Sequence, residues 1–304
     1  MHIAIIMVTY NAMPWLERCL TSVRNSSVSA TVFVVDNGSK DGTVNYIQTH
    51  FPEVQITCSD SNLGFGKANN LALKQAYQQQ FTYFLLLNQD TWLATNTIAK
   101  LTTAMDKDRF GILSCLQVQP SLSGYDVFFQ HYLRGVALPN LEDIVREDNH
   151  LENNAPLEIP FINAALWLLH RNTLEVVGGF NPYFQHYGED NDYVHRVHYH
   201  GYQVGLLTNT YFVHDRPQVT TEEKKKKLKR VAKEVYYMNP MLHYTQSDFK
   251  QNFRKEIVQR LSTFKLYPAY YSYKLFKHLH ARWNEMMAYK QQVLQKDKLL
   301  FLQN

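Results

Sequence analysis

The sequence predicts an α/β protein whose sheet is mostly parallel and is followed by a helical C-terminal extension. Short apolar runs of strand length alternate with amphipathic stretches through the first half of the chain. Clusters rich in Asn, Asp and Gly separate them, and from about residue 222 the pattern is helical only. Strands that alternate with helices form βαβ units, with helices on both faces of the sheet.

The individual elements follow from the spacing of apolar residues. Continuous apolar or β-branched runs predict strands at 3–8, 31–35, 54–57, 83–87, 112–115, 162–169 and within 203–213. Amphipathic spacing predicts helices after Pro14 and at about 44–51, 66–79, 94–106, 171–177 and 189–200. Between about 117 and 160 the periodicity fades. That stretch, with its acidic run at 142–152, is expected to be a variable loop region over the site.

Charge divides the chain into two regions. The 304 residues carry a net charge of +4, but residues 1–219 hold 13 Lys and Arg against 20 Asp and Glu, a net −7. Residues 220–304 hold 18 against 7, a net +11. We therefore expect two regions with different roles, a domain over 1–218 and a basic, aromatic-rich helical region over 219–304 whose partner would be anionic.

Neither a secretory signal nor a membrane span is expected. The opening MHIAIIMVTYN has no basic segment before its apolar run, and no stretch reaches the roughly 18 apolar residues of a span. The three cysteines, Cys19, Cys58 and Cys115, are scattered and have no metal-ligand spacing. These features favour a cytoplasmic protein with reduced thiols.

Polar clusters follow four of the predicted strands. They are Thr9-Tyr10-Asn11, residues 36–43, Asn88-Gln89-Asp90 and His214-Asp215. If their strands are parallel neighbours, the first three clusters meet at the carboxyl edge of the sheet, where α/β sheets bind ligands.

These clusters belong to a longer series of motifs that resembles glycosyltransferase family 2. VTYN, VDNGSKDGT, NLGFGKANN, LLLNQDT, GGFNPYFQHYGEDNDYVHRV and the late His214 stand in family order over about residues 3–216. The subgroup is similar to bacterial rhamnosyltransferase-like enzymes of cell-surface polysaccharide synthesis. The resemblance implies a GT-A fold and an inverting transfer of a sugar to a saccharide hydroxyl. The donor would be a nucleotide-diphosphate sugar of the dTDP-rhamnose or UDP-hexose type.

Asp36 stands at a strand end, where the resemblance implies that its carboxylate accepts the N3–H of uracil or thymine. Alternatively, residues 36–38 form an Asx-type turn and Ser39 or Asp41 caps the next helix; both can hold together. The loop at 62–70 opens a helix, whose N-terminus favours the diphosphate, unless its glycines serve only close packing. The nucleotide-contacting candidates besides Asp36 are Thr9, Asn11, Asn37, Ser39, Asn62, Gly64, Lys67, Asn69, Asn88 and Asp90.

Asn88-Gln89-Asp90 occupies the place of the family's metal-binding DxD motif. Mg²⁺ and Mn²⁺ prefer carboxylate oxygens and would neutralise the departing diphosphate. Only Asp90 offers a charged ligand here, because the first acidic position is Asn. By resemblance His214 completes the site; the alternative for it is a locally bonded strand-end histidine, and for Asp90 a simple cap.

A cluster of acids opens the helix predicted at 189–200. Glu189, Asp190 and Asp192 stand in its first turn, where acids stabilise the helix dipole without any catalytic role. The resemblance implies that one of them deprotonates the acceptor hydroxyl. We assign the base to Asp190, with Asp192 and Glu189 as alternatives. Asp192 could instead pair with Arg196 at the i, i+4 spacing.

Several expectations concern class and partners. A catalytically silent nucleotide-sugar-binding protein of the same fold is the alternative function, and Asn88 is its support. No nucleic-acid partner is expected, because that would require the α/β motifs to be coincidental. The acceptor would be a saccharide or lipid-linked saccharide. The basic C-terminal region would place the enzyme on an anionic inner membrane face, or would pack on the catalytic domain or a second copy.

Overall fold

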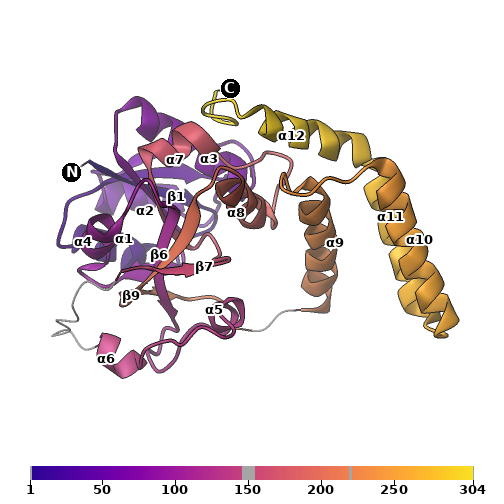
Figure 1. Ribbon diagram of the computed structural model, residues 1–304. Helices are drawn as coiled ribbons and strands as arrows, with labels where there is room; N and C mark the ends of the chain where they lie inside the picture. The colour runs from indigo at the N-terminus through magenta and orange to yellow at the C-terminus, as the bar shows by residue number, and fades with distance from the viewer. Residues whose placement is uncertain (1, 146–154, 219–220, 304) are drawn as a thin grey trace. The chain divides into compact units, whose positions relative to one another are not determined.

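The computed structural model describes residues 2–145, 155–218 and 221–303, which form two compact units (Figure 1). The first unit spans residues 1–220 and also includes 298–304, while the second spans 221–297. The boundary expected from the sequence lay at 218, with all later residues in the second region. In the structure, the last residues return to the first unit. No described helix is both long and apolar enough to cross a membrane.

The first unit is built on one sheet, and the predicted α/β class is confirmed. Within the described residues the strand order is β3-β2-β1-β4-β8-β6-β9-β5, with β7 also paired to β9. Strand β1 is parallel to β2 and β4, β2 to β3, and β6 to β9. The strands are β1 (Ile3–Thr9), β2 (Thr31–Asp36), β3 (Gln55–Cys58), β4 (Tyr83–Leu87), β5 (Thr91–Leu93), β6 (Phe110–Val118), β7 (Leu157–Ile159), β8 (Leu166–His170) and β9 (Gln203–His214).

Helices cover both faces of this sheet, because successive strand residues point to opposite sides. In β1, Ala4 and Ile6 belong to one apolar cluster, whereas Ile3, Ile5 and Met7 belong to the other. Helix α1 buries the predicted stripe of apolar residues in the second cluster. The helices of this unit are α1 (Leu16–Arg24), α2 (Thr43–His50), α3 (Phe65–Gln78), α4 (Thr97–Ala104), α5 (Val127–Tyr132), α6 (Leu141–Val145), α7 (Arg171–Val177) and α8 (Glu189–Tyr199).

The structure corrects several element bounds and adds features that the sequence did not predict. Strand β8 is antiparallel to β4 and β6, and β5, which the sequence did not predict, is antiparallel to β9. The stretch at 117–160 contains α5, α6 and β7, elements too short to show a period. Strand β8 begins at Leu166 rather than at residue 162, and residues 203–214 form one strand. Residues 146–152 of the acidic run lie outside the described residues.

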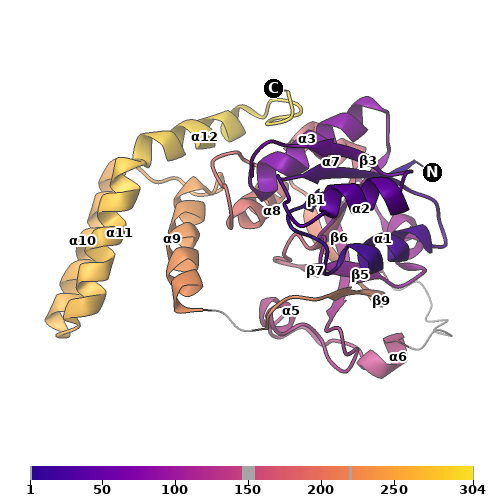
Figure 2. The ribbon, with the colours of Figure 1, turned by 180° about the vertical axis from the view of Figure 1, so that it is seen from behind.

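The second unit is helical, as the sequence predicted. It comprises α9 (Glu222–Met238), α10 (Gln246–Ser262), α11 (Leu266–Ala281) and α12 (Trp283–Gln295). Helices α10 and α11 lie side by side as an antiparallel hairpin (Figure 2). A core of aromatic rings, packed mostly edge to face, holds the unit together. Phe249 lies 4.8 Å from Trp283, 5.1 Å from Phe253 and 5.2 Å from Tyr237, centroid to centroid.

Candidate functional site

The carboxylate of Asp36 is buried at the end of β2, where the loop holds it on both oxygens. Oδ1 accepts the hydroxyls of Thr9 (2.8 Å) and Ser39 (2.5 Å). Oδ2 accepts the backbone amides of Gly38 (3.1 Å) and Ser39 (2.9 Å), which forms the Asx-type turn. These bonds occupy about as many positions as a carboxylate offers. The group is therefore rigidly oriented, and a bound base would have to share one of its oxygens.

The loop after β1 is tied to the loop after β2. The amide of Asn11 donates to Ser39 Oγ (2.8 Å), and Asn11 Oδ1 accepts the amide of Lys40 (2.9 Å). Asn11 has a φ of 49°, in the left-handed region that Asn tolerates better than most residues. Since β1 and β2 are parallel neighbours, the two polar clusters meet at the carboxyl edge of the sheet.

The 62–70 loop joins the same edge through Asn37. Its Oδ1 accepts the amide of Leu63 (3.2 Å), and its Nδ2 donates to the carbonyl of Gly64 (3.4 Å). Gly64 has a φ of 82°, and a Cβ there would lie 2.3 Å from the carbonyl oxygen of Gln185. The loop therefore lies against the segment that leads into α8, and this close contact requires a glycine at position 64.

The other candidates of this loop differ in exposure. Asn62 is exposed and its Oδ1 accepts the amide of Gly64 (2.8 Å). Lys67 is exposed at the start of α3. Asn69 is buried, and its Nδ2 donates to the carbonyl of Phe65 one turn earlier (2.9 Å). The Asn69 amide therefore serves its own helix, whereas Lys67 is open to a ligand.

The third cluster lies at the end of β4 and turns into β5. The amide of Asn88 donates to the carbonyl of Ala165 (3.0 Å). Gln89 bonds both backbone groups of Tyr10, which links this cluster to the loop after β1. Three polar clusters thus lie together at one edge of the sheet.

Asp90 and His214 meet because β5 pairs with β9. Their Oδ1 and Nε2 atoms lie 3.4 Å apart, and the Asp215 amide donates to the Asp90 carbonyl (2.8 Å). His214 is buried, and its Nδ1 atom has no hydrogen-bond partner among the described residues. Across the described ranges, no three His, Cys, Asp or Glu side chains gather as a metal site. The pair offers one carboxylate oxygen and one imidazole nitrogen to a divalent ion, and substrate phosphates would have to supply further ligands.

The acids of α8 have different surroundings. Asp190 is partly buried, and its Oδ1 accepts the amide of Asn191 (2.8 Å). Burial raises the pKa of Asp190 to about 6, against the opposing effects of backbone hydrogen bonds, including that of Ala164, and of the Arg216 charge. Since Ala164 adjoins the residue that accepts the Asn88 amide, Asp190 lies at the same edge of the sheet.

Asp192 forms the i, i+4 pair that its spacing allows. Its Oδ2 lies 2.9 Å from Arg196 Nε, and both side chains are almost fully buried. The guanidinium also donates to the carbonyls of Val177 (2.6 Å) and Gly179 (2.7 Å). Asp192 is therefore a structural anchor of α8, while Glu189, also buried, stands beside Asp190.

An ion pair that the sequence did not predict lies near Asp190. Arg216 donates to both oxygens of the fully buried Asp126, at 2.6 Å and 3.0 Å, and Asp126 also caps α5. Burial raises the pKa of Asp126, but the hydrogen bonds and charge of Arg216 outweigh it and lower the pKa below its usual value. Ninety residues separate the partners, so no local pattern indicates the pair. The only signal was that Arg216 directly follows His214-Asp215.

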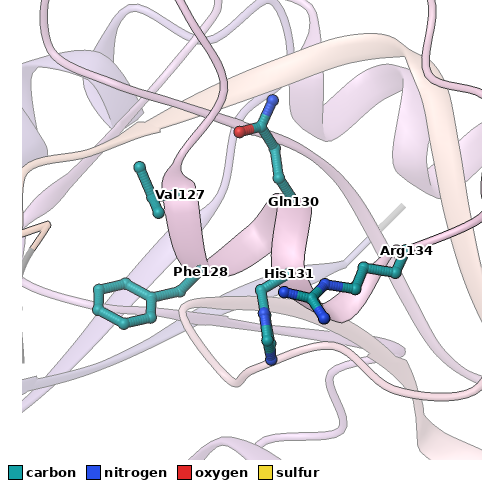
Figure 3. Close-up of a pocket in the computed structure, with 5 residues that line it drawn as sticks. All are labelled: Val127, Phe128, Gln130, His131 and Arg134. Carbon is teal, nitrogen blue, oxygen red and sulfur yellow. The ribbon is translucent and has the colours of Figure 1, made fainter.

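Helix α5 also lines an open cavity of about 410 Å³ (Figure 3). Its lining includes none of the predicted nucleotide or base residues, so it is not the expected donor site. Phe128 links it to the ion pair, because the guanidinium of Arg216 lies 4.8 Å from the centre of its ring. The lining residues are Val127, Phe128, Gln130, His131 and Arg134.

The end of the chain packs under the glycines that precede α8. The amide of Gly179 donates to the carbonyl of Leu300 (2.8 Å), and the amide of Leu299 donates to the carbonyl of Glu175 (3.1 Å). A Cβ on Gly178, whose φ is 83°, would lie 2.2 Å from the Leu300 carbonyl. The GGF motif therefore needs its glycines for a contact with residues that lie more than a hundred positions later.

The profile of glycosyl transferase family 2 matches residues 4–176, which is more than half of the chain. The chain belongs to glycosyl transferase family 2. It is 26% identical over 254 residues to the N-acetylglucosaminyl-diphospho-decaprenol L-rhamnosyltransferase of Mycobacterium tuberculosis, found in strains H37Rv and CDC 1551. The match covers 76% of this chain and 82% of the mycobacterial protein.

Solved structures show that this family 2 chain has the GT-A glycosyltransferase fold. The crystal structure of S. aureus TarS 1–349 in complex with UDP matches with a TM-score of 0.53 at 16% identity, over 97% of this chain and 81% of that chain. GalNAc-T7 with UDP, GalNAc and Mn²⁺ matches with a TM-score of 0.53 at 16% identity, over 79% and 51%. TarS 1–349 in complex with UDP-GlcNAc has a TM-score of 0.51 at 15% identity, over 81% and 68%.

Proposed function

We propose that this family 2 glycosyltransferase moves a sugar from a UDP- or dTDP-linked donor to a hydroxyl of a lipid-linked saccharide, with inversion. The name of the mycobacterial relative describes rhamnosyl transfer to a lipid-linked N-acetylglucosamine, and it supports the acceptor class. The UDP and UDP-GlcNAc complexes of TarS support a nucleotide donor. The proposal places this reaction in cell-surface polysaccharide synthesis, in the cytoplasm at the inner membrane face.

The observation that carries the proposal is the environment of Asp190. Its carboxylate interacts with the backbone of Ala164, and the neighbouring Ala165 accepts the amide of Asn88 at the end of β4, which supports a place at the carboxyl edge of the sheet. Burial raises its pKa to about 6, which suits a group that must be ionised near neutral pH and still accept a proton. Asp192 is bound to Arg196, so its oxygens are less available for this role.

In the proposed reaction Asp190 accepts the proton of the acceptor hydroxyl. The hydroxyl oxygen forms a bond to the anomeric carbon as the bond from that carbon to the diphosphate oxygen breaks. The nucleoside diphosphate leaves with the electron pair from the opposite side, so the anomeric configuration inverts. This displacement needs one base and no covalent intermediate.

The donor would lie along the clusters at the sheet edge. We propose that the buried Asp36, with Thr9, binds the nucleobase of the donor. The diphosphate would lie at the 62–70 loop, where Lys67 is exposed. Further contacts are proposed for Asn11, Asn37, Ser39, Asn62, Gly64, Asn69 and Asn88. Asp90 and His214 would hold Mg²⁺ or Mn²⁺, which would supply positive charge to the departing diphosphate. GalNAc-T7 with UDP and Mn²⁺ supports a divalent ion for this fold.

A donor screen coupled to product analysis tests the proposal. Purified protein is incubated with UDP- and dTDP-sugars and a short-chain lipid-linked saccharide, and nucleotide release is measured with and without acceptor. Acceptor-dependent release and a product of inverted anomeric configuration by NMR are expected. Nucleotide binding without release would favour the silent binding protein, and retained configuration would contradict the mechanism.

A further inference from the structure

The α10–α11 hairpin buries aromatic residues at one end and exposes apolar residues at the other. Phe249, Phe253 and Leu279 are buried among other rings and aliphatic groups. Among the described residues, the five most exposed large hydrophobic side chains all lie in the hairpin or its turn. They are Phe264 (91% exposed), Leu266 (68%), Tyr267 (66%), Val258 (57%) and Tyr270 (54%). Contiguous exposed apolar groups mark an interaction site more often than a solvated surface.

The turn of the hairpin places an aromatic ring where glycine is preferred. Helix α10 ends in a Schellman arrangement, in which the amide of Phe264 donates to the carbonyl of Leu261 (3.0 Å) and that of Lys265 to the carbonyl of Arg260 (2.9 Å). Phe264 occupies the left-handed position of this motif, with a φ of 54°. A bulky residue is strained there, and an exposed ring gains no burial in return. Neither cost is offset within the unit.

Basic residues accompany these apolar groups. Residues 257–284 contain five Lys or Arg and no Asp or Glu. Lys265, Lys274 and Lys277 are exposed. Lys274 lies 4.8 Å from the ring centre of Tyr270, and Lys277 lies 5.5 Å from that of Tyr273. Exposed tyrosines and lysines that directly follow an exposed Phe and Leu are a combination that prefers the boundary between headgroups and acyl chains.

We propose that the tip of this hairpin, centred on Phe264, inserts into the surface of an anionic bilayer. Phe264 and Leu266 enter the acyl boundary, Tyr267 and Tyr270 lie at the headgroups, and Lys265 and Lys274 contact lipid phosphates. Charge complementarity selects this occupant over a second copy of the chain, because two such tips would bring like charges together. The inference rests on the proposed function, whose lipid-linked acceptor lies in such a bilayer.

Vesicle sedimentation with the full chain tests the hairpin. Wild-type protein should bind vesicles that contain phosphatidylglycerol, bind phosphatidylcholine vesicles weakly, and dissociate as salt is raised. Phe264→Gly should lower the affinity for anionic vesicles about tenfold or more, because the variant has no aromatic ring to transfer from water into the bilayer. The same variant should unfold at an unchanged or higher temperature, since glycine relieves the left-handed strain.

Leu122→Gly is the matched control. Leu122 is also an exposed apolar residue in the left-handed region, with a φ of 55°, but it lies in the first unit. Its replacement should leave vesicle binding unchanged. Equal vesicle binding by wild type and Phe264→Gly would overturn the proposal. So would a lower unfolding temperature with an altered oligomeric state in sedimentation velocity, since the ring would then pack on protein.

The binding measurement contains no donor sugar, so it separates the two proposals. Vesicle binding that depends on Phe264, in a protein that transfers no sugar, would contradict the proposed function but still support membrane insertion of the hairpin tip. Sugar transfer by a protein that does not bind anionic vesicles would contradict the insertion proposal alone.

Discussion

The two units of this protein differ in the groups that stand out from the usual distribution, although both bury charged side chains, including Glu234 and Lys290 in the second unit. In the first unit, charged groups such as Asp36, Asp126 and Arg196 are buried below the surface. In the second unit, Phe264 and Leu266 stand in solvent. Buried charges cost free energy unless they are paired, and exposed apolar groups forgo the stabilisation of burial.

The difference teaches where to look for function in each unit. In the first unit most buried charges have partners inside the fold, so the useful question is which of them remain available to a ligand. Arg196 makes its bonds to carbonyls and Asp192, whereas the carboxylate of Asp190 accepts backbone amides and has a raised pKa. In the second unit the exposed apolar groups are not buried by the unit itself, and we propose that an external partner covers them.

The largest expected effect is on catalysis. Asp190→Asn should lower kcat by about 10²- to 10⁴-fold, because a general base is lost, and should leave the dissociation constant of the donor unchanged. Steady-state kinetics and calorimetry measure the two. Because burial raises the pKa of Asp190 to about 6, kcat/KM of the wild type should fall as pH drops below that value and the carboxyl becomes protonated.

Glu189→Gln serves as the comparison, since that acid is buried in the same turn. If Asp190→Asn retains full activity while Glu189→Gln loses it, the base is Glu189. Asp190 would then not be the acid of α8 that accepts the proton.

Breaking the buried ion pair should affect stability rather than chemistry. Arg196→Met leaves Asp192 without its cation in the interior and should lower the free energy of unfolding by about 3–5 kcal/mol. The exposed pair of Arg24 and Glu53, 2.7 Å apart, is the control, and Arg24→Met should cost about 1 kcal/mol or less. Urea denaturation decides, and equal losses in the two variants would contradict the assignment of Arg196 as a structural anchor.

Metal removal tests the pair of Asp90 and His214. Excess EDTA should lower turnover at least about tenfold, because positive charge no longer meets the departing diphosphate. Added Mg²⁺ or Mn²⁺ should restore it. Asp90→Asn should raise the metal concentration needed for half-maximal rate. Full turnover in EDTA, together with an active Asp90→Asn variant, would remove the metal from the mechanism.

The smallest expected effect is on the affinity for the nucleotide. Asp36→Ala should raise the dissociation constant for UDP or dTDP by about tenfold, since a buried hydrogen bond to the base contributes roughly 1–3 kcal/mol. Asp41→Ala is the matched loop control, because Asp41 also accepts backbone amides, from Met13 and Thr43, but is exposed. Equal weakening by both variants would assign the effect to loop order and not to a base contact.

Local patterns in the sequence determined much of this protein. The apolar runs at 3–8, 31–35 and 83–87 predicted three buried strands, because the pattern of each strand lies in its own residues; the structure pairs them as parallel neighbours. The order of the polar clusters indicated the family. The spacing of Asp192 and Arg196 suggested their ion pair, since residues four apart share a helix face. Composition indicated the basic helical region.

Tertiary structure alone decided what depends on distant pairing. Asp90 lies near His214 through the register of β5 and β9, and Arg216 binds Asp126 across ninety positions of the chain. The return of residues 298–304 to the first unit has no local pattern either. That Phe264 is exposed could be seen only from the packing of α10 against α11. Local periodicity shows which face of an element is apolar, but which element covers that face depends on the packing of the whole chain.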